Sequence, residues 1–192
     1  MTNDLNEQAD RLIDHATVVH HAIGGLAPDE FKVAFRNHPA GVAVITADAG
    51  DGPVGLTATS VFSVSAEPPL LVFSLSSQSS SAPTIARADT VIVHLLGVDQ
   101  LHIAKLCATS GIDRFADTAM WDRLITGEPY FPAASTWIRG RIINRMEAGG
   151  STVIAVHALQ AKSPAIDAIA DESPLVYHNR TWHRLDEKSR IA

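Results

Sequence analysis

Apolar residues recur at helical spacing in the first part of the chain. Over residues 3–23, leucine, isoleucine, valine and alanine return to one face every three or four positions, which predicts an amphipathic helix. A glycine pair at 24–25 ends this pattern, and a second, shorter helix over 28–37 begins with proline, as first turns often do. We therefore expect an N-terminal helical extension over residues 1–27 and a single domain over residues 28–192.

After this helix the pattern changes to that of β-strands. Short runs rich in valine, isoleucine and threonine alternate with turn sequences, of which "DAGDGP" and "EAGG" are typical of hairpins. Many antiparallel strands with two or three small helices predict a mainly β protein, a β-barrel with helical additions. The expected strands cover residues 41–47, 54 onward, 70–75, 90–96, 135–146, 151–162 and 175–178, and the short helices residues 81–88 and 99–108.

The composition narrows the class of protein. A chain of 192 residues with 46% hydrophobic and 19% charged residues is long enough and apolar enough to bury a core. A net charge of −6 without any cluster of lysine and arginine argues against a nucleic-acid partner. No apolar run approaches the roughly 20 residues that a membrane-spanning helix needs. We expect a soluble protein with no membrane partner.

The single cysteine, Cys107, excludes an internal disulfide and fits a reducing compartment. We interpret it as a small buried apolar residue, and Trp137 and Trp182 as core or interface aromatics. Acidic residues interrupt the N-terminal segment where a signal peptide would need an apolar centre. The sequence therefore predicts a cytoplasmic protein.

The stretch from Gly55 to Thr84, "GLTATSVFSVSAEPPLLVFSLSSQSSSAPT", is rich in hydroxyl side chains around an apolar strand. A strand end, a group of serines and the start of a helix together make a neutral cradle for a phosphate group. The stretch contains no lysine and no P-loop pattern, which argues against a nucleoside triphosphate. Alternatively, the serines only form turns and helix caps.

The order of several short motifs resembles the flavin reductase-like family. These motifs are "HPAGVAVIT", "GPVGLTATSVFSVSAEPPLLVFSLS", "SSSAPTI", "VIVHLL", "DQLHIA", "DRFAD" and "LVYHNRTWHRL", and the resemblance runs from about Phe31 to Leu185. It implies a homodimeric split β-barrel over residues 28–192 that binds FMN or FAD. It also implies NADH or NADPH as hydride donor and a partner monooxygenase that receives the reduced flavin.

The resemblance also implies where the flavin binds. The segment from Pro53 to Thr57, with the hydroxyls that follow it, corresponds to the part of the family that lies against the isoalloxazine ring. The later serines correspond to the part near the ribityl chain and phosphate. The residues assigned to the flavin in this way are Pro53, Val54, Gly55, Leu56, Thr57, Thr59, Ser60, Ser74, Leu75, Ser76, Ser80 and Ser81.

The chain departs from the family pattern in three motifs. Thr59 and His94 each stand where the family usually has asparagine, and we interpret His94, inside an apolar strand, as a hydrogen-bonded core residue. Gly149, Gly150 and Ser151 stand where the family has Gly-Asp-His, whose histidine is commonly placed near the nicotinamide site. The resemblance implies that this change removes a contact to the dinucleotide, while hydride transfer itself needs no proton relay at the ring.

Other histidines and one arginine are candidates for contacts outside the flavin segments. His178 is a candidate for a nicotinamide contact. Arg114, in the "DRF" motif, either meets an anionic group of a cofactor or forms a surface salt bridge. His15, His20 and His21 on the first predicted helix lack supporting carboxylates, so we expect no metal site.

Three functions remain open from the sequence. The first is an NAD(P)H:flavin oxidoreductase that transfers hydride from nicotinamide C4 to flavin N5. The second is a flavin-binding protein of the same fold without nicotinamide turnover, either a carrier or another oxidoreductase. The third is a structural subunit with a vestigial pocket. Flavin binding separates the first two from the third, and NADH consumption separates the first from the second.

Overall fold

The computed structural model describes residues 25–165 and 173–191, in two compact units, residues 1–38 and 39–192. The helix predicted over residues 3–23, with its three histidines, lies outside the described residues. The predicted boundary between a 1–27 extension and a 28–192 domain therefore stays a prediction. Among the described residues, no helix has the length and apolar content needed to cross a membrane.

The described part of the first unit is helix α2, Pro28–Arg36, which confirms the second predicted helix. Proline occupies its first turn, and the Glu30 carboxylate accepts a hydrogen bond from the Ala27 backbone N–H at 3.0 Å. Both features stabilise a helix start, where backbone N–H groups lack intrahelical partners. The rings of Phe31 and Phe35, one turn apart, lie with their centroids 4.7 Å apart and their planes tilted by 39°, and α2 has no buried residue.

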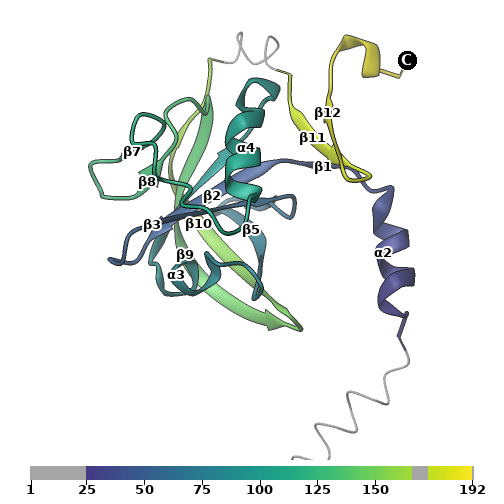
Figure 1. The fold of residues 1–192 in the computed structure, drawn as a ribbon, viewed down its shortest axis with the longest axis horizontal. Coiled ribbons are helices and arrows are strands. Elements are labelled where there is room, and N and C mark those ends of the chain that lie inside the picture. Colours follow the sequence, from purple (N-terminus) through teal and green to yellow (C-terminus); the bar gives the residue numbers. More distant parts are fainter. Residues whose placement is uncertain (1–24, 166–172, 192) are drawn as a thin grey trace, which may run out of the picture. The chain divides into compact units, whose positions relative to one another are not determined.

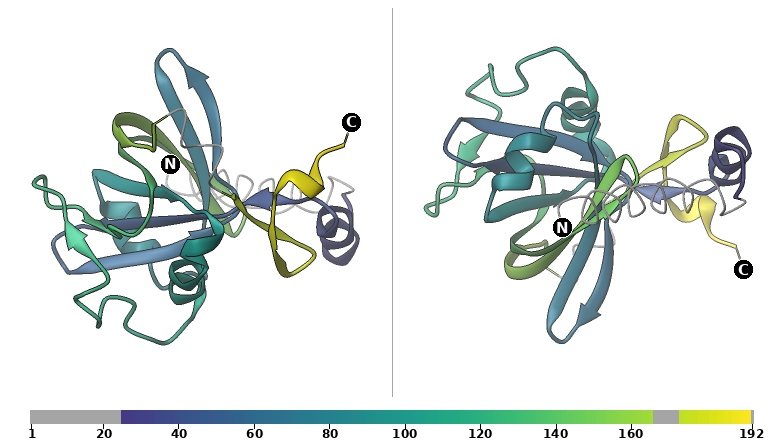
Figure 2. Two further views of the ribbon diagram at one scale, coloured as in Figure 1. Left: turned by 90° about the horizontal axis from the view of Figure 1, so that it is seen from above. Right: turned by 90° about the horizontal axis from the view of Figure 1, so that it is seen from below.

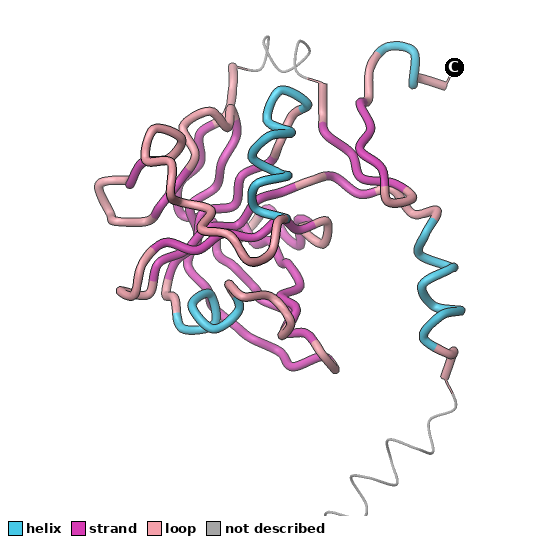
Figure 3. The backbone as a smooth tube through the Cα atoms, viewed as in Figure 1, coloured by secondary structure: helices cyan, strands magenta, loops and turns pink. Residues whose placement is uncertain are grey.

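The second unit is built on one seven-stranded antiparallel sheet (Figures 1 and 3). Its strand order is β3-β2-β6-β9-β10-β5-β4. The strands are β2 (Ala43–Asp48), β3 (Pro53–Ala58), β4 (Phe62–Ala66), β5 (Pro69–Ser76), β6 (Thr90–Leu95), β9 (Thr136–Ala148) and β10 (Ser151–Lys162). In Figure 2 the β4–β5 hairpin extends away from the other strands. The mainly β fold predicted from the sequence is confirmed.

Smaller elements surround this sheet. The strands β1 (Ala40–Gly41), β11 (Leu175–His178) and β12 (Thr181–Arg184) form a three-stranded sheet, and β7 (Asp122–Arg123) pairs with β8 (Pro129–Tyr130). The helices are α3 (Ala82–Arg87) and α4 (Leu101–Ala108), with 3₁₀ turns at Val98–Gln100 and Glu187–Ser189. The predicted helices over 81–88 and 99–108 are thus confirmed to within two residues at each end.

The predicted strands are found, with two instructive differences. The single strand expected over 41–47 is divided at Val42, because β1 pairs with β11 whereas β2 pairs with β3 and β6. Strand β12 was not predicted: its hairpin turn uses Asn179 and Arg180, both at positive φ, in place of glycine. Without glycine, the usual sequence signal for a tight hairpin is absent.

Strand β2 is buried on both faces and separates two core clusters. Ile45 belongs to the cluster that also contains Phe73 of β5 and Ile154 of β10. Val44 faces the other cluster, which includes Ile103 of α4 and Phe131. Burial on both faces explains why "VAVIT" is a continuous apolar run instead of an alternating one.

A buried ion pair ties the segment before β8 to the sheet. Glu128 is 5% exposed, and its carboxylate accepts hydrogen bonds from Thr90 Oγ1 at 2.7 Å, from the Thr126 hydroxyl, and from Arg139 Nε at 2.7 Å. Burial alone would raise the pKa of Glu128, but these hydrogen bonds together hold it below its ordinary value. The charged form of Glu128 is therefore a source of stability.

Replacing Glu128 with Gln tests this contribution. Because hydrogen bonds to a charged group contribute more than neutral ones, we expect the free energy of unfolding near pH 7 to fall by about 2 kcal/mol. The pKa of Glu128 is lowered in the folded chain, so its contribution is full above the unfolded pKa and is lost as the pH falls through the folded pKa. Denaturant titrations should show the two proteins converging in acid; a constant difference down to about pH 3 would contradict this role.

Candidate functional site

A small pocket lies where the start of β3 meets two loops. It is lined by residues 53–55 of β3, by Ser80 and Ser81 before α3, and by residues 112–115, which follow α4; its volume is about 160 Å³. Pockets that hold a whole drug-sized molecule usually measure roughly 300–1,000 Å³. This pocket therefore fits one end of a nucleotide, such as a phosphate with its adjoining carbons.

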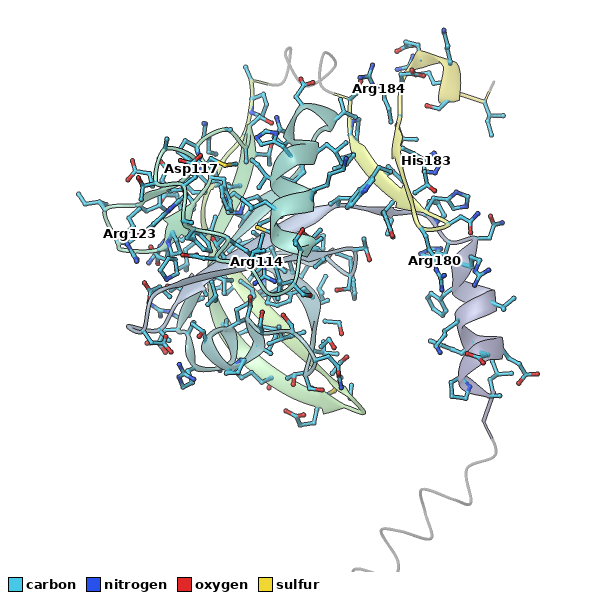
Figure 4. The ribbon with its side chains drawn as sticks, in the orientation of Figure 1. Arg114, Asp117, Arg123, Arg180, His183 and Arg184 are labelled. Carbon is cyan, nitrogen blue, oxygen red and sulfur yellow. The ribbon has the colours of Figure 1, made fainter. Side chains whose placement is uncertain are left out.

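Arg114 brings a positive charge to this pocket. Its guanidinium donates hydrogen bonds to Ser80 Oγ at 3.2 Å and to the Thr109 carbonyl at 2.8 Å, while its Nε is buried and has no hydrogen-bond partner. Among residues 25–165 and 173–191, no carboxylate forms an ion pair with Arg114. Figure 4 shows it on the segment that follows α4. The surface salt bridge considered from the sequence is therefore absent from the described part of the chain.

The floor of the pocket is closely packed. Residues 77–81, between β5 and α3, form the serine loop. Its buried Ser81 hydroxyl donates to the Gly55 carbonyl at 2.8 Å and so fixes the loop against β3. A Cβ added at Gly55 would make a tight contact with Cys107 Sγ at 3.3 Å and would touch Phe115 Cζ at 3.4 Å. Burial raises the pKa of the Cys107 thiol to about 12, so this cysteine acts as a core residue, as predicted.

The tip of the β9–β10 hairpin lies beside the end of β5. The Gly150 carbonyl accepts hydrogen bonds from the Ser77 backbone N–H at 3.0 Å and from the Ser77 hydroxyl at 2.9 Å. Ser151 is paired with Ser76 in the sheet. The position where the family pattern has histidine is therefore held next to the serine loop, although the turn contains two glycines.

The structure divides the predicted flavin residues into two groups. Those that line the pocket are Pro53, Val54, Gly55, Ser80 and Ser81. Leu56 and Leu75 place their side chains in the core, so only their backbone groups remain for a ligand. Which of these residues contact flavin stays a prediction.

Several hydroxyls are engaged inside the protein. Thr57 Oγ1 donates to the Ala104 carbonyl of α4 at 2.6 Å. Ser60 Oγ accepts from the Ser74 backbone N–H at 2.9 Å and joins the start of β4 to β5. Ser76 Oγ accepts from the Gln78 N–H at 3.3 Å in the turn, whereas Thr59 is exposed. Ser76 thus serves in a turn, as the alternative interpretation has it, whereas the phosphate cradle stays a prediction.

The other candidates lie outside the pocket. His178 is on β11, its ring 5.5 Å from that of His183, and it does not line the pocket, so its contact to nicotinamide stays a prediction. Trp137 is 5% exposed, and Trp182 packs against Tyr177 at 4.7 Å. Among the described residues, no three metal-ligating side chains come together.

His94 is a fully buried core residue, as predicted. Burial lowers the pKa of His94 to about 4, against the opposing effect of its hydrogen bond to the Val44 carbonyl.

The pocket residues that the sequence left unassigned are Ile112, Asp113 and Phe115. Two of these three residues belong to the "DRF" motif, so this motif was the sequence feature that could have placed them in the pocket.

An apolar groove runs along the β4–β5 hairpin, separate from the small pocket. Its volume is about 470 Å³, and its lining includes Phe62, Leu70, Leu95 and Ile138. Phe62 is 61% exposed and Leu95 40% exposed, and Val64 nearby on β4 is 55% exposed. Large apolar side chains grouped in this way mark an interaction surface more often than a solvated one.

Comparison with known proteins agrees with this fold. The family model of the flavin reductase like domain matches residues 35–186. An NADH:FMN oxidoreductase of Rhodococcus erythropolis is 39% identical over 160 residues, 83% of each chain. The reductase component of a 4-nitrophenol 4-monooxygenase/4-nitrocatechol 2-monooxygenase from Rhodococcus opacus is 27% identical over 134 residues, 70% of this chain and 71% of that protein.

A solved structure shows the same architecture. The crystal structure of a flavin reductase domain protein from Arthrobacter sp. FB24 has a TM-score of 0.78 and 31% sequence identity, and the match covers 86% of this chain and 100% of that one. The family model spans the seven-stranded sheet and all pocket residues. The chain therefore belongs to the flavin reductase-like family.

Proposed function

We propose that this protein is an NAD(P)H-dependent flavin reductase that supplies reduced FMN or FAD to a partner monooxygenase. The observation that carries this proposal is the placement of Arg114. Its guanidinium has no carboxylate partner among the described residues and lies beside two serines in a pocket of phosphate size. A flavin nucleotide offers the anionic group that this donor set lacks. Family membership and the relative named NADH:FMN oxidoreductase support FMN and NADH as the first pair to test.

The residues of the pocket suit the phosphate end of a flavin nucleotide. The buried Nε of Arg114 is an orphan donor, and buried donors without partners are costly unless a ligand satisfies them. Arginine presents several N–H groups in a plane, which matches phosphate oxygens better than a lysine does. The Ser80 hydroxyl, already 3.2 Å from the guanidinium, adds a short polar group at the same end.

The chain's role in the reaction is to bind and orient. A bound flavin would supply the electron-accepting ring for a hydride from nicotinamide. No general base is required at that step, so the protein acts by holding two rings in contact and by excluding water. The backbone of β3 at residues 53–57, next to the pocket, is the segment we assign to the ring.

We further propose that the protein is a homodimer whose apolar groove forms the contact. The groove groups exposed apolar side chains, which are unfavourable in water. A second copy packed on the β4–β5 hairpin covers them by an isologous contact, in which each copy offers the same surface. The exposed Phe62 and Val64 support this surface as the one that is covered.

Replacing Arg114 with Gln tests the phosphate contact. Because a hydrogen bond from a charged donor contributes about 1.5–3 kcal/mol, the dissociation constant for FMN should rise roughly ten- to a hundredfold. Riboflavin, which lacks the phosphate, should bind both proteins equally and serves as the control ligand. Fluorescence quenching measures both. An equal loss for FMN and riboflavin would place Arg114 elsewhere in the site, and failure of the wild type to bind either would refute the function.

Replacing Phe62 with Glu tests the dimer. A charge in the apolar contact should convert the dimer to monomers, because a buried carboxylate without a partner is strongly unfavourable. Ile125 is fully exposed outside the groove, so Ile125→Glu is the matched control and should leave the assembly unchanged. Sedimentation velocity distinguishes the species; a wild-type monomer that binds FMN contradicts the proposal.

The turn at Gly149 and Gly150 predicts weak binding of NADH. The acid and imidazole of the family pattern are absent, and a lost hydrogen bond to a polar ligand costs about 1–3 kcal/mol, or roughly ten- to more than a hundredfold in affinity. The double variant Gly150→Asp/Ser151→His should therefore lower the KM for NADH about tenfold with little change in kcat.

Ser151→Phe, which adds a ring without nitrogen, is the control for this double variant and should not lower the KM. Steady-state oxidation of NADH with FMN in excess measures both constants. Saturation of the wild type at micromolar NADH would show that another residue makes the contact.

A further inference from the structure

His94 links two elements through opposite sides of its ring. Its Nδ1 lies 2.9 Å from the Val44 carbonyl of β2, and its Nε2 accepts a hydrogen bond from the Phe131 backbone N–H at 3.1 Å. Since Nε2 accepts, the ring is neutral and the proton resides on Nδ1, which donates to Val44. His94 and Phe131 are both completely buried, so no water competes for these bonds.

From Phe131 a series of aromatic contacts leads to the pocket. The Phe131 ring stacks on Phe115 with centroids 5.7 Å apart and 23° between the ring planes. Phe115 lines the pocket beside Arg114 and lies against Gly55 at its floor. Packed aromatic rings of this kind have a preferred geometry, so a displaced Phe131 displaces its neighbour.

Trp121 fixes the same wall from the other side. Its indole N–H donates to the Phe115 carbonyl at 2.9 Å, and its ring meets the Phe115 ring edge to face at 5.2 Å. Phe131 follows directly on β8, and the carbonyl of Pro129, two residues before it, accepts a hydrogen bond from the buried Thr46 hydroxyl of β2. Hydrogen bonds to β2 and to His94 of β6 therefore hold the segment around β8, whose Phe131 packs against the pocket wall.

We infer that His94 is a positioning residue for the flavin pocket: through its bond to the Phe131 N–H it sets the place of Phe115, and with it that of Arg114. The inference rests on the proposed function, since it concerns the site assigned to flavin. His94 is 0% exposed and touches no ligand itself, so it acts only through the wall. The family pattern has asparagine at this position, and its carboxamide is too short to make both hydrogen bonds that His94 makes, to Val44 and to Phe131.

Two substitutions separate the two bonds of His94. The amide of His94→Asn lies near the place of Nδ1 and retains a donor for Val44, but it does not reach Phe131. The carbonyl oxygen of His94→Gln lies near the place of Nε2 and retains an acceptor for the Phe131 N–H, but loses the bond to Val44. Both variants lose the imidazole and one buried hydrogen bond, so each is the stability control for the other.

We expect the dissociation constant for FMN to rise about tenfold in His94→Asn and to stay within about twofold of wild type in His94→Gln. Ile154→Val, a buried change in the other core cluster, should weaken folding without altering FMN affinity. Equal FMN affinities in the two His94 variants, whether lowered or not, would overturn the inference.

A measurement without flavin keeps the inference testable if the proposed function fails. The chain has three tryptophans, and the indole N–H signal of Trp121 in a ¹⁵N spectrum, assigned with Trp121→Phe, reports on the Phe115 carbonyl. This signal should shift in His94→Asn and remain near its wild-type position in His94→Gln. No shift in either variant, or the same shift in both, would refute the positioning role independently of flavin binding.

Discussion

Strand β2 must be covered on both faces, and the candidate site depends on that constraint. Val44 and Ile45 are both fully buried and belong to different core clusters, so a layer is required on each side of the sheet. On one side this layer consists of α4 and the segment that follows it. The close approach of this layer to β3 at Gly55 forms the floor of the pocket.

The pocket retains a charge that the fold alone does not require. A partly buried guanidinium without a carboxylate costs stability, and folded proteins usually pair such groups. The chain does so elsewhere, where Glu128 and Arg139 are joined at 2.7 Å. The contrast between this ion pair and Arg114 favours a ligand as the missing partner. It also argues against a purely structural subunit with a vestigial pocket.

The two flavin-binding functions, a reductase and a carrier, differ in whether the protein also binds and oxidises NADH or NADPH. Hairpin β9–β10 brings Ser151 beside Ser76, and two bonds from Ser77 hold the turn in place. The departure from the family pattern therefore removes functional groups without loosening the backbone. A protein altered in this way is still able to bring two rings together, which is the main requirement of hydride transfer.

The local sequence pattern was sufficient to predict most secondary-structure elements of this protein. Hydrophobic period, turn residues and motif order predicted α2, most strands of the large sheet and the stretch that carries the pocket serines, because these signals act between near neighbours. The sequence could not show that Thr57 and Ser60 would be used inside the fold, or that Arg114 would meet Ser80, 34 residues away. It also gave no sign that His94 contacts Phe131. These pairings arise only when elements distant in sequence are packed against one another, and tertiary structure alone decided them.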